Sequence, residues 1–113
     1  TKQVWLYESR TTVKDCGHIL EDIYRGQLVS KSASKKMLNY LKQQQRRNKI
    51  PSGLPYGVKS ANKTGEIRGY EHDAAFVFSD GADYIIVVMT QGDGNAIADI
   101  RRISRMVYQY FNK

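Results

Sequence analysis

The run SDGADYIIVVMT at residues 79–90 sets the fold class of this chain. Its Asp80-Gly81 dipeptide is typical of tight hairpin turns, because glycine accepts the left-handed backbone that such turns need. Residues 85–89, IIVVM, are apolar at every position, which is typical of a strand that is buried on both faces of its sheet. We therefore predict a hairpin whose second strand needs cover on two sides. An interior strand also needs a neighbour on each edge, so we expect one strand to be missing from the chain.

The flanking segments extend this hairpin into an α+β domain. Residues 74–78, AAFVF, form the first strand of the hairpin, and residues 56–63 form an earlier strand of imperfect alternation. Apolar side chains recur at helical spacing in residues 95–112 and in two segments within residues 11–49. The predicted order is helix, helix, three strands, helix, with the helices packed on an antiparallel sheet.

The turn and cap residues place the ends of the first two helices. Thr12, followed three residues later by an acid, is a typical helix cap, and Gly26 is suited to end the same helix. The second helix opens near Ser30 or Ser32 and ends in the polar, basic tract at residues 43–49. We interpret this tract as a solvated helix end.

Composition limits the possible functions. The 113 residues make one domain at most, and no apolar run approaches the roughly 20 residues of a membrane span. A net charge of +7 favours anionic partners, although a basic surface without such a partner also explains it. The tract at residues 43–49 lacks aromatic side chains for base stacking, so we expect no nucleic acid. Cys16 is the only cysteine, which excludes an internal disulfide, and we expect no metal and no cofactor.

The stretch SANKTGE at residues 60–66 contains the candidate site. On a strand, Lys63 and Gly65 point to one face and Thr64 to the other. A lysine supplies charge, a threonine supplies a hydroxyl, and a glycine lets a ligand approach the backbone closely. This combination suits a carboxylate that lies along a strand edge. The alternative interpretation is a polar strand end that turns at a glycine.

The surroundings of this stretch resemble the C-terminal part of the class A serine β-lactamases and their penicillin-binding relatives. Lys-Thr-Gly, the KTG motif at residues 63–65, is the third signature of that superfamily, after Ser-x-x-Lys and Ser-Asp-Asn. The segment IPSGLP at residues 50–55 precedes the motif, and two strands and a terminal helix follow it, in an order and spacing similar to the family's. The resemblance covers residues 11–113 and implies a β-lactamase/transpeptidase-like fold.

The resemblance also implies roles for individual residues. Lys63 and Thr64 would bind the substrate carboxylate, with Gly65 giving access to the strand. The backbone N–H of Glu66 would be one oxyanion donor. Class A β-lactamases commonly place an arginine on the following strand, where this chain has YEHD at residues 70–73. Arg68 is the nearest guanidinium in the sequence and the candidate to support the carboxylate.

No nucleophile is expected in the chain. Residues 32–35 and 60–63 both fit Ser-x-x-Lys. The second stretch lies on a predicted strand, where positions three apart face opposite sides, and the first lies in a helix that the family places away from its cleft. Residues 79–81, SDG, imitate Ser-Asp-Asn but form the hairpin turn. His72 and Asp73 are adjacent on a strand and lack a nucleophilic partner, so we expect a structural role.

We predict that residues 1–113 are the C-terminal fragment of one β-lactamase-like domain, since the start of the sequence also shows no signal-peptide pattern. Its predicted parts are the tail of a preceding loop at residues 1–10, two helices within 11–49, three strands within 56–90 and a terminal helix at 95–112. In the loop tail, Glu8 lies too near the first helix to serve as a deacylating glutamate.

The activity implied for the intact parent is hydrolysis of β-lactams by a serine acyl-enzyme, with this chain alone inactive. The alternatives are a penicillin-binding D-alanyl-D-alanine carboxypeptidase, transpeptidase or sensor domain, and a basic nucleic-acid-binding module. The expected partners are the carboxylate of a β-lactam or D-alanyl peptide, and the missing N-terminal part of the domain. A second copy that pairs along the strand at residues 84–90 could replace that part. The resemblance implies a secreted or cell-surface parent.

Overall fold

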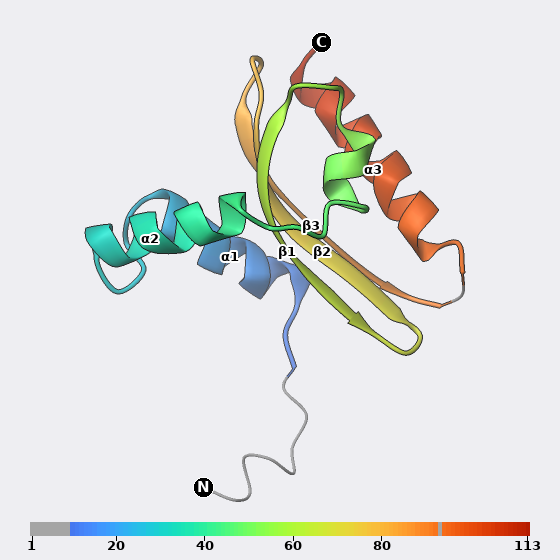
Figure 1. Ribbon diagram of the computed structural model, residues 1–113, viewed down its shortest axis with the longest axis horizontal. Helices are drawn as coiled ribbons and strands as arrows, with labels where there is room; N and C mark the ends of the chain where they lie inside the picture. Colours follow the sequence, from blue (N-terminus) through green and yellow to red (C-terminus); the bar gives the residue numbers. More distant parts are fainter. Residues whose placement is uncertain (1–9, 93) are drawn as a thin grey trace, which may run out of the picture.

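The computed structural model describes residues 10–92 and 94–113. Its elements are α1 (Val13–Tyr24), α2 (Lys31–Lys42), the short 3-10 helix η2 (Ile50–Gly53), β1 (Lys59–Ile67), β2 (Tyr70–Phe78), β3 (Asp83–Gln91) and α3 (Ala96–Phe111). Figure 1 shows these elements in chain order, and they confirm the predicted α+β arrangement. Within the described residues, no helix combines the length and apolar character needed to cross a membrane.

Side-chain caps fix where the first two helices begin. The Thr12 hydroxyl accepts a hydrogen bond from the Asp15 N–H, and the Ser30 hydroxyl accepts one from the Ala33 N–H. Each bond satisfies a backbone donor that has no partner within its helix. Ser30, rather than Ser32, is therefore the cap of α2. The helix ends at Lys42, so the predicted helical tract at residues 43–49 is a loop.

The three strands form an antiparallel sheet in the order β1-β2-β3. Two predicted boundaries are wrong. β1 begins at Lys59 and continues to Ile67, whereas residues 56–63 were expected, and β2 begins at Tyr70, four residues before Ala74. The reason is the turn at residues 68–69, where Gly69 has a φ of 79°. This turn lets the backbone ladder extend through polar side chains, whose lack of apolar alternation hid the strand.

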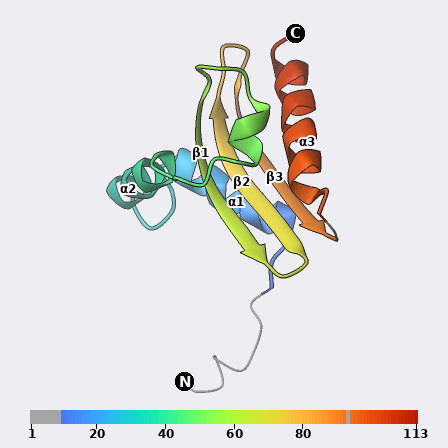
Figure 2. The same ribbon diagram turned by 45° about the vertical axis from the view of Figure 1, so that its right-hand side comes forward.

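Helices cover both faces of the sheet (Figures 1 and 2). α1 and α2 pack on one face, and α3 packs on the other together with η2. Tyr84, Ile86 and Val88 belong to the core beneath α3, whereas Ile85 and Val87 pack in the core beneath α1. The strand is thus covered on both faces as predicted, although the face toward α1 is only partly buried. Each fully buried side chain of this size contributes roughly 1.5–3 kcal/mol.

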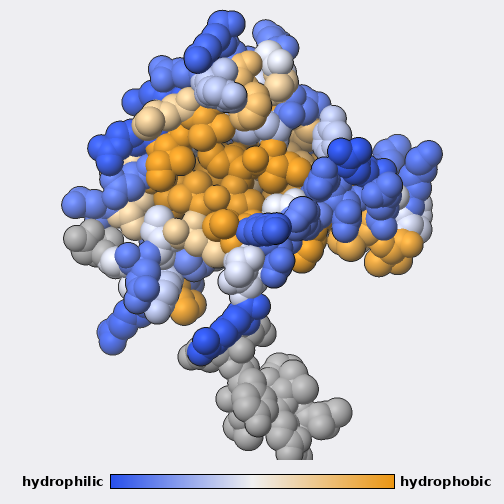
Figure 3. Space-filling model, turned by 180° about the vertical axis from the view of Figure 1, so that it is seen from behind, coloured by the Kyte–Doolittle hydropathy of each residue, from blue (hydrophilic) through white to orange (hydrophobic). Residues whose placement is uncertain are grey.

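β3 has one strand neighbour, β2, among the described residues, so its other edge is free. A broad apolar area lies on the far side of the molecule relative to the first view (Figure 3). Large apolar side chains remain partly exposed on the helices, among them Ile19 of α1 at 49% and Met106 of α3 at 61%. Extended apolar areas of this kind mark contact surfaces in soluble proteins.

Candidate functional site

The KTG motif lies within β1, at an edge of the sheet, and not at a strand end. The Lys63 residue is exposed, and the Thr64 residue on the opposite face is only 4% exposed. A Cβ added to Gly65 would lie 3.7 Å from His72 Cβ, an ordinary contact. Nothing in the described part of the chain therefore requires a glycine here, which leaves room beside the strand for a group from outside.

Among the described residues β1 pairs with β2 alone, and its free edge presents backbone groups at alternate residues. The Asn62 carbonyl accepts a hydrogen bond from Gln44 Nε2 at 3.4 Å, and the Thr64 carbonyl accepts one from Lys63 Nζ at 2.5 Å. Both are side-chain donors, so these carbonyls face away from β2. Because outward-facing groups recur every second residue on an antiparallel edge strand, the N–H of Glu66 also faces the free edge.

A cluster of four charged side chains, Arg46, Lys49, Glu66 and Glu71, joins β1 and β2 to the loop after α2. Lys49 Nζ lies 2.7 Å from Glu66 Oε2 and 2.8 Å from Glu71 Oε2. The Glu66 contact is a hydrogen bond, whereas the Glu71 contact is an ion pair outside hydrogen-bond geometry. Lys49 Nζ also donates to the His72 carbonyl at 3.1 Å. Arg46 Nη1 lies 2.5 Å from Glu66 Oε1. We call these four residues the Lys49 cluster.

The interpretation of residues 43–49 as a solvated tract is wrong for Lys49, because its side chain is only 2% exposed. Burial lowers the pKa of Lys49, but the Glu66 and Glu71 carboxylates outweigh it and hold that pKa above the ordinary 10.5. The hydrogen bond from Lys49 is the main reason that the pKa of Glu66 falls below its ordinary 4.5. Lys49 and Glu66 are therefore both charged at neutral pH.

Sequence reasoning missed Lys49 and Arg46, although the hairpin held a signal for them. Glu66 and Glu71 are equally distant from the two-residue turn and are partners in the strand register. Two like charges directly opposite on a sheet are destabilising unless a cation lies near both. A hairpin with this register therefore requires a cation from elsewhere. The sequence pattern does not reveal this register, because the strand ends beside the turn are polar and lack apolar alternation.

A buried network of polar side chains also holds the loop at residues 46–50 against the sheet. Asp73, 1% exposed, accepts hydrogen bonds from the Ile50 N–H at 2.9 Å and from Asn62 Nδ2 at 3.0 Å. Asn62 Nδ2 also donates to the Arg46 carbonyl at 3.1 Å. Burial raises the pKa of Asp73, against the opposing effect of the Asn62 and Ile50 donors. The network holds residues 46–50 against both strands that carry the candidate site.

In neither stretch that fits Ser-x-x-Lys does the structure pair the serine with the lysine. Ser60 Oγ accepts a hydrogen bond from Arg47 Nη2 at 3.0 Å, while Lys63 Nζ bonds the Thr64 carbonyl. Ser32 and Lys35 both lie exposed on α2. Neither serine has a lysine partner in these contacts.

The remaining candidates also have structural partners or open positions. In the turn at residues 79–81, the Ser79 hydroxyl donates to the Ala82 carbonyl at 2.5 Å. His72 Nδ1 accepts the Thr90 N–H at 3.2 Å, and Asp73 lies in the network described above. Arg68 is exposed in the turn between β1 and β2. Glu8 lies outside the described residues.

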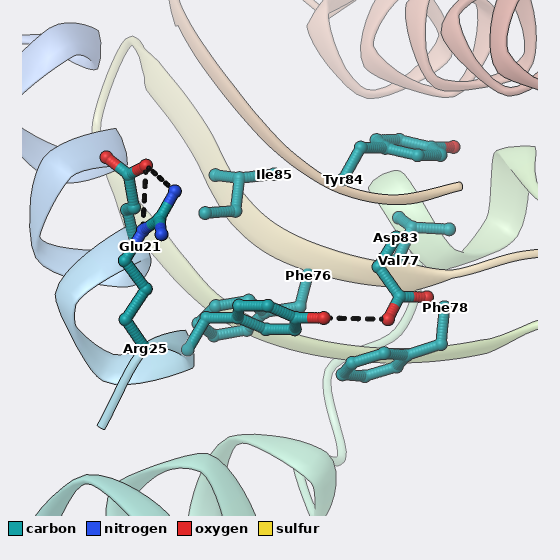
Figure 4. Close-up of a pocket in the computed structure, with 9 residues that line it drawn as sticks. Glu21, Arg25, Phe76, Val77, Phe78, Asp83, Tyr84 and Ile85 are labelled. Atoms are coloured by element: carbon teal, nitrogen blue, oxygen red, sulfur yellow. Dashed lines mark hydrogen bonds and ion pairs between the residues drawn. The ribbon is translucent and has the colours of Figure 1, made fainter.

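Two cavities open on the face of the sheet beneath α1. One, of about 280 Å³, lies beside the KTG motif and has mostly apolar walls, with Leu20, Val87 and Met89 among its lining. The other, of about 180 Å³, is shown in Figure 4. Four of its polar side chains pair with one another: the Tyr24 hydroxyl donates to Asp83 Oδ2 at 3.0 Å, and Arg25 pairs with Glu21. The hydroxyl of Tyr84, which also lines this cavity, has no hydrogen-bond partner among the described residues. Because Lys63, Thr64 and Gly65 line the larger of these two cavities, the candidate site is the β1 edge together with that cavity.

Within residues 10–92 and 94–113, no group of three or more His, Cys, Asp or Glu side chains is arranged to hold a metal ion. The chemistry that the described residues offer is recognition of an anion or carbonyl oxygen by lysine, threonine and backbone N–H groups along β1.

Comparisons with known proteins place the family and the fold of this chain. Residues 6–111 match the family model described as "Beta-lactamase enzyme family". The structure is similar to that of PBP-A, with 27% sequence identity and a TM-score of 0.80, covering 90% of this chain and 40% of that one. No curated protein sequence matches the chain.

Two β-lactamase structures show the same fold. The enzyme from Sphaerobacter thermophilus DSM 20745 is 24% identical with a TM-score of 0.78, covering 87% of this chain and 39% of its own. The enzyme from Burkholderia vietnamiensis is 20% identical with a TM-score of 0.80, covering 91% and 41%. The chain thus spans about two fifths of the length of these matched structures. With nearly its whole length matched by the family model, the chain belongs to the β-lactamase enzyme family.

Proposed function

We propose that this chain is the C-terminal part of a serine β-lactamase-like hydrolase that acts on β-lactams through an acyl-enzyme. The observation that carries the proposal is the β1 edge, where the KTG motif is followed by an outward-facing backbone N–H at Glu66. A variant of PBP-A has been solved as an acyl-enzyme complex with penicillin G. The similarity of this chain to PBP-A supports an acyl-transfer reaction.

The proposed roles follow from the chemistry of each group. Lys63 and Thr64 bind the substrate carboxylate by charge and hydroxyl, and Gly65 lets the substrate lie against the strand. The Glu66 N–H donates to the oxyanion of the tetrahedral intermediate, together with the N–H of the attacking serine. Loss of one such donor costs on the order of 100- to 1000-fold in kcat.

The attacking serine is proposed to lie upstream, in a segment of the parent that also supplies a strand beside β3. That segment would cover the free β3 edge and part of the apolar area. By family, we propose that the parent acts outside the cytoplasm.

A fluorescent penicillin tests this proposal. We expect stoichiometric labelling of the full-length parent that survives denaturation, and no labelling of the isolated 113-residue chain. Thr64→Val in the parent should lower the labelling rate at low probe concentration, whereas Ser32→Ala on the exposed face of α2 should not. Covalent labelling of the isolated chain would contradict a nucleophile outside it.

A penicillin-binding carboxypeptidase, transpeptidase or sensor is the second candidate, and one observation favours it. β2 carries Glu71, paired with Lys49, in the region where class A β-lactamases commonly have an arginine. A chromogenic cephalosporin separates the two functions. Multiple turnovers per protein molecule indicate a β-lactamase. A burst of about one equivalent of chromophore per protein molecule, followed by little turnover, indicates a penicillin-binding protein.

A further inference from the structure

The carboxylate of Glu66 is bound by the kinds of donor that would bind a substrate carboxylate. Its Oε1 accepts from the Thr64 hydroxyl at 3.3 Å and from Arg46 Nη1 at 2.5 Å. Its Oε2 accepts from Lys49 Nζ at 2.7 Å. One carboxylate of the protein therefore receives a hydroxyl, a guanidinium and an ammonium beside the KTG motif.

This arrangement uses donors that a ligand would need. A threonine hydroxyl has a single hydrogen, so the Thr64 hydroxyl cannot donate to Glu66 and to a ligand carboxylate at once. The local charge is also balanced, because Glu66 and Glu71 face Arg46 and Lys49. An incoming anion would meet the Glu66 carboxylate at close range and would gain no net positive charge from the Lys49 cluster.

The Lys49 cluster is buried at Lys49 and exposed to solvent at Glu66 and Arg46. Lys49 is 2% exposed and is held against β2 by the His72 carbonyl and Glu71. The Glu66 side chain is 32% exposed, and its second cation, Arg46, is 65% exposed. Glu66 can therefore be replaced or displaced at the surface while its buried partner keeps Glu71.

We propose that Glu66 is a specificity-determining residue whose carboxylate occupies the carboxylate subsite of this protein. This inference rests on the proposed function. A substrate with a free carboxylate, such as a penicillin, must displace Glu66 from Thr64 before it binds there, so acyl compounds with a neutral amide or ester at that position are relatively favoured. Neutral compounds do not require Thr64 to leave Glu66 and are not repelled by it.

Matched variants separate the Glu66 carboxylate from the general charge of the cluster. Glu66→Gln keeps the side-chain shape and removes its charge, and Glu66→Ala removes both acceptor oxygens. Glu71→Gln is the control, because it makes the same change in charge at the other partner of Lys49 and leaves the bonds to Thr64 and Arg46 intact. If Glu66→Ala does not fold, Glu66→Gln still provides the comparison.

The experiment uses the full-length parent and two probes, benzylpenicillin and its methyl ester. We expect the ratio of acylation rates, acid over ester, to rise about tenfold in Glu66→Ala, the change that one charge-assisted hydrogen bond supports. A smaller rise is expected in Glu66→Gln, and the smallest in Glu71→Gln, which makes the same change in net charge but leaves the Thr64 hydroxyl bound to Glu66. An equal ratio in the wild type and both Glu66 variants would overturn the proposal.

A second measurement separates this inference from the proposed function. Phenylacetate, a simple carboxylate without a reactive bond, is titrated while the backbone amide signals of Thr64 and Gly65 are followed by NMR. Saturable shifts in the Glu66 variants but not in the wild type support the proposal even if no β-lactam acylates the protein, which would refute the proposed function alone. Equal binding by wild type and variants, or binding by none, overturns the proposal.

Discussion

Glu66 of β1 and Glu71 of β2 stand directly opposite each other in the antiparallel register, and the ammonium of Lys49 lies within 2.8 Å of an oxygen of each carboxylate. The lysine comes from the loop between α2 and η2. Three segments that are separate in sequence thus share one buried cation. The site strand, its neighbour and the loop should therefore lose stability together.

Lys49→Met should destabilise the protein by about 3 kcal/mol at neutral pH, because it leaves two facing carboxylates without their buried cation. Chemical denaturation at pH 7 measures this change. Lys35→Met, an exposed lysine on α2, is the control and should change the free energy of unfolding by less than about 0.5 kcal/mol. A loss of similar size in both variants would show that the cation between the two carboxylates is not what matters.

The free energy of unfolding should fall at both acid and alkaline pH, because Glu66 and Lys49 each lose their charge there. The pKa of Glu66 is lowered, so its contribution is present above its ordinary value of 4.5 and is lost as the pH falls through the lowered value. The pKa of Lys49 is raised, so its contribution is present below 10.5 and is lost as the pH rises through the raised value.

Asp73 acts in the opposite sense at acid pH. Burial raises its pKa, so the protein gains stability from protonating it as the pH falls.

Denaturation curves from pH 3 to 11 on the wild type and Glu66→Gln test whether Glu66 causes the loss of stability at acid pH. Glu66→Gln should flatten the acid limb, and an acid limb of unchanged slope would assign it to other carboxyl groups.

Val29→Gly should stabilise the protein by about 1 kcal/mol. Val29 has a φ of 65° and is 88% exposed, so a β-branched side chain is held in the left-handed region without burial to offset the cost. Thermal unfolding measures the change. Val13→Gly, the same substitution at an exposed position of α1, should not stabilise. An unchanged melting temperature for Val29→Gly would mean that the turn relaxes without cost.

Gly53→Ala should destabilise the protein strongly, because an added Cβ would overlap the Arg101 carbonyl oxygen and lie 2.8 Å from Ser104 Cβ. The overlap is with the backbone of α3, so the helix itself must shift, at a cost of roughly 1–3 kcal/mol. Gly94→Ala, where an added Cβ has nothing within 4 Å, is the matched control. Denaturant unfolding of the two variants provides the comparison.

The isolated chain should associate through the free edge of β3. Thr90 turns its N–H toward β2, where it meets His72, so Val87, three residues away, turns its N–H to the free edge. Val87→Pro should therefore reduce association and keep the fold, whereas Val88→Pro removes a bond to β2 and should unfold the sheet. Light scattering against protein concentration measures association, and a dispersed wild-type monomer would contradict this prediction.

The predictable part of the fold was the part encoded by local patterns. Helical spacing of apolar side chains gave α1, α2 and α3, and the Asp80-Gly81 turn with its apolar run gave the second hairpin. The first hairpin was misplaced because its ends are polar. There the ladder is held by backbone bonds and by Lys49, and neither leaves an alternating pattern in the sequence.

The candidate site divides in the same way. By itself the sequence determined the KTG motif, the α+β class and a strand apolar on both faces, since each depends on residues that are close along the chain. Only the tertiary structure decided that Lys49 is buried, that Arg46 reaches Glu66, and that Glu66 takes the Thr64 hydroxyl. The Lys49 and Arg46 contacts with Glu66 bridge 17 and 20 residues of sequence. All three contacts depend on where the loop at residues 46–50 meets β1 and β2. Burial of a charge is set by that packing and not by its neighbours in sequence.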